Sequence, residues 1–116
     1  MLLAKQGDLD QARAHLREAL RLAPDSFDAR VQLGLLCLWQ HQFDEAARYF
    51  TDETKRYPSS AYAYYLLGMA RLRQQNWPEA YACFRQACAL DPSESRYQVE
   101  LAKALKQIGE PTELKN

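Results

Sequence analysis

The sequence predicts an all-α fold, an α-solenoid in which antiparallel helix hairpins stack along one axis. The first observation behind this prediction is a 34-residue period that several residue types share. The repeating positions are Pro24, Pro58 and Pro92; Ala12, Ala46 and Ala80; Leu16, Phe50 and Phe84; Leu33, Leu67 and Leu101; and Gly34 and Gly68, with Ala102 in the third place. The second observation is that no segment alternates polar and apolar residues over the length of a strand. Strands are therefore not expected.

Length and composition are those of one globular domain over residues 1–116. Hydrophobic residues make up 47% of the chain and charged residues 26%, close to the average for folded proteins. Fifteen basic and fifteen acidic residues balance, so no overall field attracts nucleic acid or an anionic membrane. No apolar run reaches the roughly 18–20 residues of a membrane span. Three cysteines without C-x-x-C spacing favour a reducing, cytoplasmic location.

The period divides the chain into units of two helices each. Residues 1–24 read as a partial repeat that contains a second helix. In the repeat 25–58, Ser26 is expected to cap a helix that runs to about Gln40. The second helix of this repeat is expected to open at Gln42 or Asp44 and to stop before Pro58, since proline cannot continue it.

The next repeat, 59–92, follows the same plan. Ser60 precedes a helix that runs to about Gln74, and Asn76 with Glu79 forms the pattern of a capping box for the helix after it. Residues 93–109 are expected to be a capping helix, because charged and polar side chains give it a face suited to water. Residues 110–116 are expected to be a frayed tail.

These residues carry a family resemblance. The repeat 25–58 resembles the tetratricopeptide repeat (TPR) through Leu33-Gly34, Ala46, Phe50 and Pro58, and the residues of the repeat 59–92 match that pattern more closely. These residues are Leu67-Gly68, Ala80, Phe84, Ala87 and Pro92. The resemblance covers almost the whole chain. It implies a right-handed superhelix with two complete repeats flanked by half repeats.

Two residues depart from this pattern. Glu53 stands where a small apolar residue is expected, and Arg71 stands at an interior-type position. We expect the two side chains to face one another across adjacent hairpins, or Glu53 to pair with another nearby cation.

The resemblance also implies where a partner binds, because the first helices of successive repeats line a concave groove in the family. Helical spacing predicts one apolar and aromatic face on these helices, with cations toward one end. The candidate partner-binding residues are Val31, Leu35, Leu38, Trp39, Tyr62, Tyr65, Met69, Arg73 and Arg96. Trp, Tyr, Met and Arg are enriched in interfaces. The expected ligand is an apolar or amphipathic protein segment.

One known activity of the family is not expected here. Repeats that bind the C-terminal tails of chaperones use Lys and Asn on the groove face to hold carboxylates. The matching positions in this chain are Val31, Gln32, Leu35 and Leu66. These side chains cannot grip a carboxylate in that way.

Catalysis, a cofactor and a metal site find no support in the sequence. His15 and His41 are single histidines without neighbouring ligands at metal-binding spacing, and no phosphate-binding loop or nucleophile motif occurs. We therefore expect a non-catalytic protein-interaction module. Two alternatives stay open: a small secretion-type chaperone for an exported protein, and a self-assembling scaffold or a fragment of a larger repeat protein. A homo-oligomer would form through the open half repeat at the N-terminal end.

Overall fold

The computed structural model describes residues 6–114, without the side chains of Gln6, Phe27 and residues 110–114. Positions 1–5 of the expected half repeat and 115–116 of the expected tail lie outside this range. The described chain holds six helices and no strand, which confirms the all-α prediction. The helices are α1 (Gln6–Leu22), α2 (Phe27–Trp39), α3 (Phe43–Arg56), α4 (Ala61–Arg73), α5 (Trp77–Leu90) and α6 (Ser95–Leu114).

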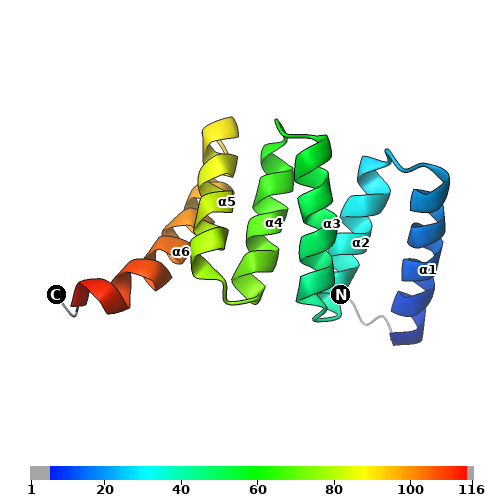
Figure 1. Cartoon of the computed structure of the whole chain (residues 1–116), viewed down its shortest axis with the longest axis horizontal. Coiled ribbons are helices and arrows are strands. Elements are labelled where there is room, and N and C mark those ends of the chain that lie inside the picture. Colours follow the sequence, from blue (N-terminus) through cyan, green and yellow to red (C-terminus); the bar gives the residue numbers. More distant parts are fainter. Residues whose placement is uncertain (1–5, 115–116) are drawn as a thin grey trace.

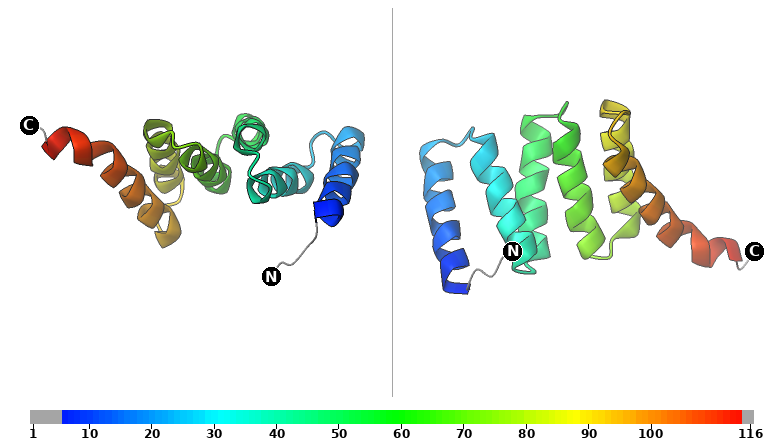
Figure 2. Two further views of the ribbon diagram at one scale, coloured as in Figure 1. Left: turned by 90° about the horizontal axis from the view of Figure 1, so that it is seen from below. Right: turned by 180° about the vertical axis from the view of Figure 1, so that it is seen from behind.

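The helices form an elongated stack in chain order. Each helix packs against the one before and the one after it along the chain. The stack measures 52 × 30 × 22 Å along its principal axes. Figure 1 shows α1 to α5 standing side by side and α6 leaving the stack obliquely. The views from below and from behind show the same zigzag of hairpins (Figure 2). This arrangement is the α-solenoid that the period predicts.

Local signals explain most helix boundaries. The hydroxyls of Ser26 and Ser60 accept hydrogen bonds from the backbone N–H groups of Ala29 and Ala63, each at 3.1 Å. These N-caps confirm the sequence prediction. Asn76 occupies the N-cap position of α5 but makes no side-chain capping bond. The helices α1, α3 and α5 each end two residues before Pro24, Pro58 and Pro92 respectively.

The core of each hairpin depends on a glycine that faces a phenylalanine. Phe50 and Phe84 are completely buried, and their rings lie against the backbone of Gly34 and Gly68. A methyl group at Gly68 would lie 2.6 Å from the Phe84 ring, and one at Gly34 would collide with the Phe50 ring. The paired helices can therefore approach this closely only because glycine has no side chain.

The expected Glu53–Arg71 pair is wrong. Glu53 is completely buried and pairs with Arg30 of α2, whose Nη1 lies 2.8 Å from Glu53 Oε1. Arg30 also donates a hydrogen bond to the carbonyl of Pro24. Arg71 pairs instead with Glu79, at 3.0 Å, within its own hairpin. The reason is geometric: Arg30 and Glu53 face one another inside one hairpin, whereas Glu53 and Arg71 belong to successive hairpins.

The first helix is held by polar contacts. The Arg13 guanidinium donates hydrogen bonds to Gln40 Oε1 at 3.0 Å, to Gln42 Oε1 at 2.7 Å and to Glu45 Oε1 at 2.8 Å. Arg17 binds the other oxygen of Glu45 at 2.9 Å. This network joins α1 to the turn between α2 and α3.

The last helix is longer than expected. The sequence predicts a capping helix to residue 109 and a frayed tail beyond it, but α6 continues to Leu114. The C-terminal part of the described chain is therefore helical, so the predicted boundary at 109 is wrong.

Candidate functional site

The predicted groove residues lie on the first helices of successive hairpins, α2, α4 and α6. Trp39, Arg73 and Arg96 are exposed. Five others are partly buried: Leu35, Leu38, Tyr62, Tyr65 and Met69. The prediction that Val31 contacts a partner is wrong. Only 4% of its surface is exposed, and it belongs to the buried core cluster formed by the second hairpin and α4. The cluster that contains Val31 packs against Leu35, Leu38, Tyr62 and Tyr65, and Val31 itself is not accessible to a ligand.

The apolar part of the site is a shelf where α2 and α4 end. Leu35, Leu38 and Trp39 line a pocket of about 480 Å³ together with His41 and Arg73. Trp39 is 56% exposed, an unusual degree for a tryptophan in a folded domain. These five residues are called the α2–α4 shelf below. Its composition, apolar with one arginine, is that of an interface centre.

The aromatic part of the site lies between α4 and α6. The rings of Tyr62 and Tyr65 stack with centroids 6.1 Å apart, and Tyr65 also lies 5.0 Å from Tyr97 and 6.2 Å from Phe84. Arg96 lies over the Tyr65 ring at 5.7 Å. Burial raises the pKa of both Tyr65 and Tyr97, so their hydroxyls stay protonated. Tyr65 of α4 thus contacts aromatic rings of α5 and α6, and these contacts fix its position at the predicted site.

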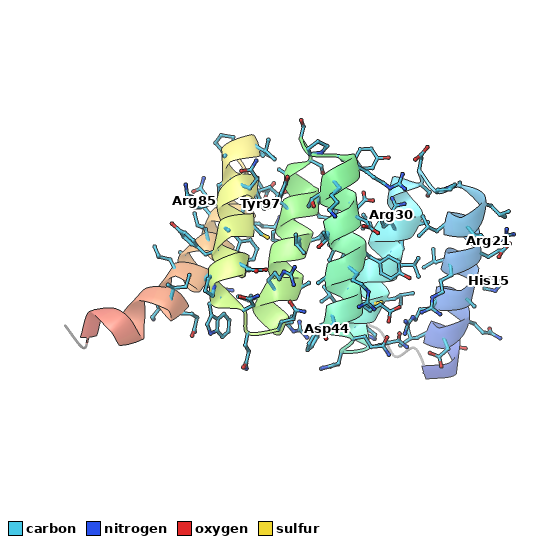
Figure 3. All side chains as sticks on the ribbon, in the orientation of Figure 1. His15, Arg21, Arg30, Asp44, Arg85 and Tyr97 are labelled. Carbon is cyan, nitrogen blue, oxygen red and sulfur yellow. The ribbon has the colours of Figure 1, made fainter. Side chains whose placement is uncertain are left out.

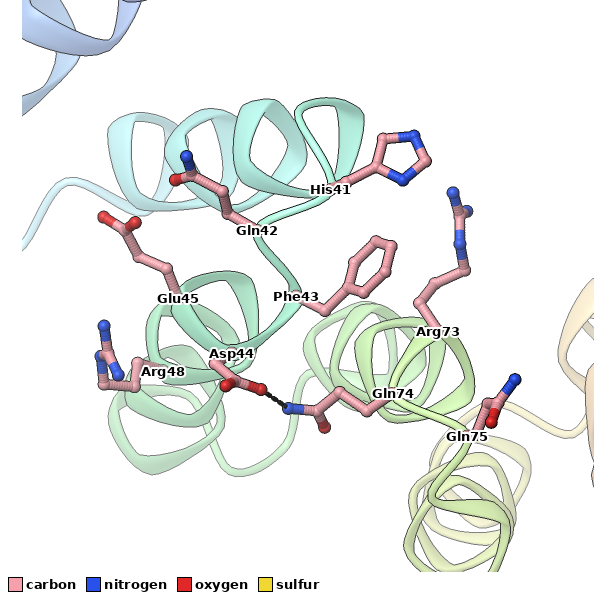
Figure 4. Close-up of a pocket in the computed structure, with 9 residues that line it drawn as sticks. All are labelled: His41, Gln42, Phe43, Asp44, Glu45, Arg48, Arg73, Gln74 and Gln75. Atoms are coloured by element: carbon pink, nitrogen blue, oxygen red, sulfur yellow. Dashed lines mark hydrogen bonds between the residues drawn. The ribbon is translucent and has the colours of Figure 1, made fainter.

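A second pocket, of about 690 Å³, opens beside the shelf at the turns that end α2 and α4. Figure 4 shows its lining, with the Phe43 ring between His41 and Arg73. The Arg73 guanidinium carbon lies 5.2 Å from the centre of the Phe43 ring, which is a cation–π distance. The imidazole of His41 lies 5.5 Å from the same ring. This is called the turn-edge pocket below.

Of the nine residues that line the turn-edge pocket, the sequence prediction named only Arg73, and it missed His41, Phe43 and Gln75 among the other eight. A signal for two of them existed in the 34-residue period. The positions that correspond to His41 and Gln75 elsewhere in the chain are Gly7 and Gly109. The signal is that His41 and Gln75 replace glycine at a position where the chain has Gly7 and Gly109 one period away.

The described part of the chain contains three free cysteines and several His, Asp and Glu side chains, the residue types that bind metal ions or supply reactive thiols. No group of three or more His, Cys, Asp or Glu side chains there could hold a metal ion. Burial raises the pKa of the Cys83 thiol to about 11, and it also raises the pKa of Cys37 and Cys88. These thiols are protonated near neutral pH and are poor nucleophiles. Figure 3 shows the labelled residues His15 and Asp44 on different helices of the stack.

Family models decide the classification. Residues 38–95 and 69–113 match one tetratricopeptide repeat model, and residues 1–36 match a second one. The chain belongs to the tetratricopeptide repeat family. No curated protein matches its sequence. A TPR fold is typical of modules that bind other proteins.

Solved structures of TPR proteins are similar to this one. A double mutant of MamA from strain RS-1 superimposes with a TM-score of 0.77 at 28% identity, over 84% of this chain and 55% of that one. MamA residues 41 to the end from Desulfovibrio magneticus RS-1 gives 0.72 at 25% identity, over 94% and 67%. The first TPR domain of Spaghetti (RPAP3), bound to the HSP90 peptide SRMEEVD, gives 0.82 at 20% identity, over 90% and 82%.

The chain spans 55–61% of the length of the MamA chains that it matches first. The likeness to the RPAP3 domain, at 20% identity, establishes the fold only. None of the described helices is long and apolar enough to cross a lipid bilayer.

Proposed function

We propose that this TPR domain binds an apolar or amphipathic segment of another protein in the groove formed by α2, α4 and α6. The observation that carries the proposal is the α2–α4 shelf, where Leu35, Leu38 and the exposed Trp39 line one pocket. Contiguous exposed apolar surface beside an arginine is typical of protein-binding sites. The RPAP3 domain of similar fold holds a peptide, which supports this use of the fold.

The groove is suited to a chain segment more than to a small molecule. The shelf and the aromatic wall of Tyr62 and Tyr65 lie on successive first helices, so a ligand that touches both must extend along the stack. An amphipathic segment places apolar side chains at regular intervals on one face and can reach both parts. The wall is held by packing around Tyr65, so it needs little ordering when the ligand binds.

The chaperone-tail clamp is not the mode we propose. Two of the positions that would hold carboxylates carry Val31 and Leu66, and both side chains are buried, at 4% and 3% exposure. A third carries Leu35 of the apolar shelf. The groove therefore favours apolar side chains at the place where that clamp would bind charge.

Selection of peptides from a displayed random library on the purified chain tests the proposal. We expect enrichment of sequences rich in Leu, Ile, Phe or Trp. Trp39→Glu should weaken binding of an enriched peptide by at least about tenfold, because a charge replaces the most exposed apolar anchor.

Leu22→Glu is the matched control for this change. Leu22 is 68% exposed on α1, so the substitution adds the same charge to an exposed apolar site outside the groove. Circular dichroism of both variants checks that the helices remain. Equal binding by Trp39→Glu and Leu22→Glu, or no apolar enrichment at all, would refute groove binding.

A further inference from the structure

Two residues of the described chain adopt left-handed backbone conformations without being glycine. They are His41, with φ of 63°, and Gln75, with φ of 61°. Each directly follows the C-cap of a first helix in a Schellman motif: the Gln42 N–H donates to the Cys37 carbonyl at 2.7 Å, and the Asn76 N–H to the Arg71 carbonyl at 2.9 Å. Glycine is favoured at such a position, because a Cβ atom lies too close to the following carbonyl oxygen in the left-handed conformation.

The chain uses glycine at the other two positions of this register, Gly7 and Gly109. Those two glycines lie within α1 and α6 and have no positive φ, so the left-handed conformation is found only at His41 and Gln75 among the described residues, where it costs stability. Both of them line the turn-edge pocket. Backbone strain that gathers at one pocket points to a function of the side chains held there.

The acidic residues of the pocket have hydrogen-bond or ion-pair partners, whereas Arg73 has neither among the described residues. The carboxylate of Asp44 accepts a hydrogen bond from Gln74 at 2.6 Å, and that of Glu45 is bound by Arg13 and Arg17. Arg73, by contrast, makes no ion pair or hydrogen bond to any side chain in the described part of the molecule, and its contact is the Phe43 ring. The pocket thus holds two arginines, Arg48 and Arg73, that form no ion pair within the described part of the molecule, and one carboxylate, Asp44, that is bound only by a neutral amide. Of the two arginines, Arg73 also lines the α2–α4 shelf and is placed to bind an anionic group of a ligand held there.

The position of Arg73 links this pocket to the groove. Arg73 and His41 line both the turn-edge pocket and the α2–α4 shelf. Figure 4 shows their side chains pointing to the same side of the molecule, one on each side of Phe43. A segment with apolar side chains on the shelf would therefore bring its next residues to the Arg73 guanidinium and the His41 imidazole.

We propose that Arg73, with His41 and Gln75 beside it, binds an Asp or Glu side chain of the segment held by the shelf. This inference rests on the proposed function and specifies its ligand as an acidic amphipathic segment. The guanidinium supplies two parallel donors for a carboxylate, and the neighbouring imidazole and amide supply further ones. The site lies at the end of α4, away from the groove-face positions of a chaperone-tail clamp.

The peptides selected on the chain provide the test. We expect the enriched sequences to carry Asp or Glu beside the apolar residues, and amidation of the peptide C-terminus to leave binding unchanged. Replacing that Glu with Gln in a fluorescein-labelled peptide should weaken binding about fivefold, as expected for one partly exposed ion pair. In the Arg73→Gln variant the same replacement should have no effect on affinity. Arg85→Gln, an exposed arginine of α5, is the matched control and should behave as the native chain.

Apolar enrichment without acids, or an acid preference that survives in Arg73→Gln, overturns this inference and leaves groove binding intact. Loss of binding on amidation also overturns it, since a terminal carboxylate would then be the anchor. The absence of apolar enrichment removes both proposals together.

A second variant separates structure from binding at the strained turn. His41→Gly should raise the melting temperature by about 4–8 °C, because glycine adopts the left-handed conformation without backbone strain. The same variant should bind the acidic peptide more weakly than the native chain. A more stable variant with unchanged affinity would show that His41 takes no part in the site, and would overturn that part of the inference.

Discussion

Single residues explain how two repeats with different side chains share one shape. The second hairpin has Arg30 and Glu53 where the third has Tyr64 and Ala87, at the same two positions of the period. One hairpin holds a buried ion pair at these positions, with 2.8 Å between nitrogen and oxygen, and the other has a large aromatic residue and a small apolar one there. The ion pair is incomplete, because Glu53 Oε2 has no hydrogen-bond partner. A buried pair of this kind is costly to break but is not a strong source of stability.

Glu53→Ala should therefore destabilise the fold by about 3–5 kcal/mol, because it leaves the Arg30 charge buried without its partner. Adding Arg30→Tyr should recover most of the loss, since the pair then matches Tyr64 and Ala87. Urea denaturation of both variants measures the free energies of unfolding. A double variant no more stable than Glu53→Ala would show that the two hairpins are not interchangeable here.

The partner of Glu53 could not be predicted from the sequence. Gly34 and Phe50 were identified from the sequence only as repeating positions, and the structure shows that the Phe50 ring lies against the Gly34 backbone. Glu53 and Arg71 were paired wrongly, because a helical wheel gives the face of a residue but not which neighbouring helix covers that face. Val31 was misplaced for the same reason. Its face was predicted, but the degree to which the core closes over it depends on how α4 packs.

Among the helices, α1 differs from the others in what holds it. Leu16 of α1 is partly exposed, whereas Phe50 and Phe84 at the same position of the period are completely buried. Arg13 and Arg17 of α1 both form ion pairs with Glu45 of α3. Burial alone would raise the pKa of Glu45, but the hydrogen bonds from both arginines outweigh it and lower that pKa below its usual value. The contribution of Glu45 to stability is present above the unfolded-state pKa and is lost as pH falls through the lower folded-state value.

Acidification should therefore loosen α1 before it loosens the centre of the stack. We expect hydrogen-exchange protection of the α1 amides to fall between about pH 5 and pH 3, while that of α4 persists. Glu45→Gln should show weak protection of α1 even near neutral pH, because the charge is absent throughout. Native-like protection of α1 in Glu45→Gln would contradict the role given to this network.

The elongated shape of the whole molecule is explained by its 34-residue repeat. Each hairpin covers only part of its apolar surface and needs its neighbours, so the 34-residue period predicts a one-dimensional stack. The helices from residue 26 to 90 could be predicted from this period and from the serine and proline signals at their ends. The first helices of the hairpins, α2, α4 and α6, could also be predicted, because they recur. The turn-edge pocket could not, since it forms where the ends of α2 and α4 meet the start of α3 and is shaped by two left-handed residues.

The central claim is that the partner lies on the face of α2, α4 and α6. Site-specific photo-crosslinking in cells of the source organism tests it most directly, with benzoylphenylalanine placed at Trp39 or at Arg85. Both positions are exposed, but only Trp39 belongs to the α2–α4 shelf. We predict a discrete cross-linked protein from position 39 that is absent from position 85. Cross-links from position 85 with none from position 39 would contradict the account.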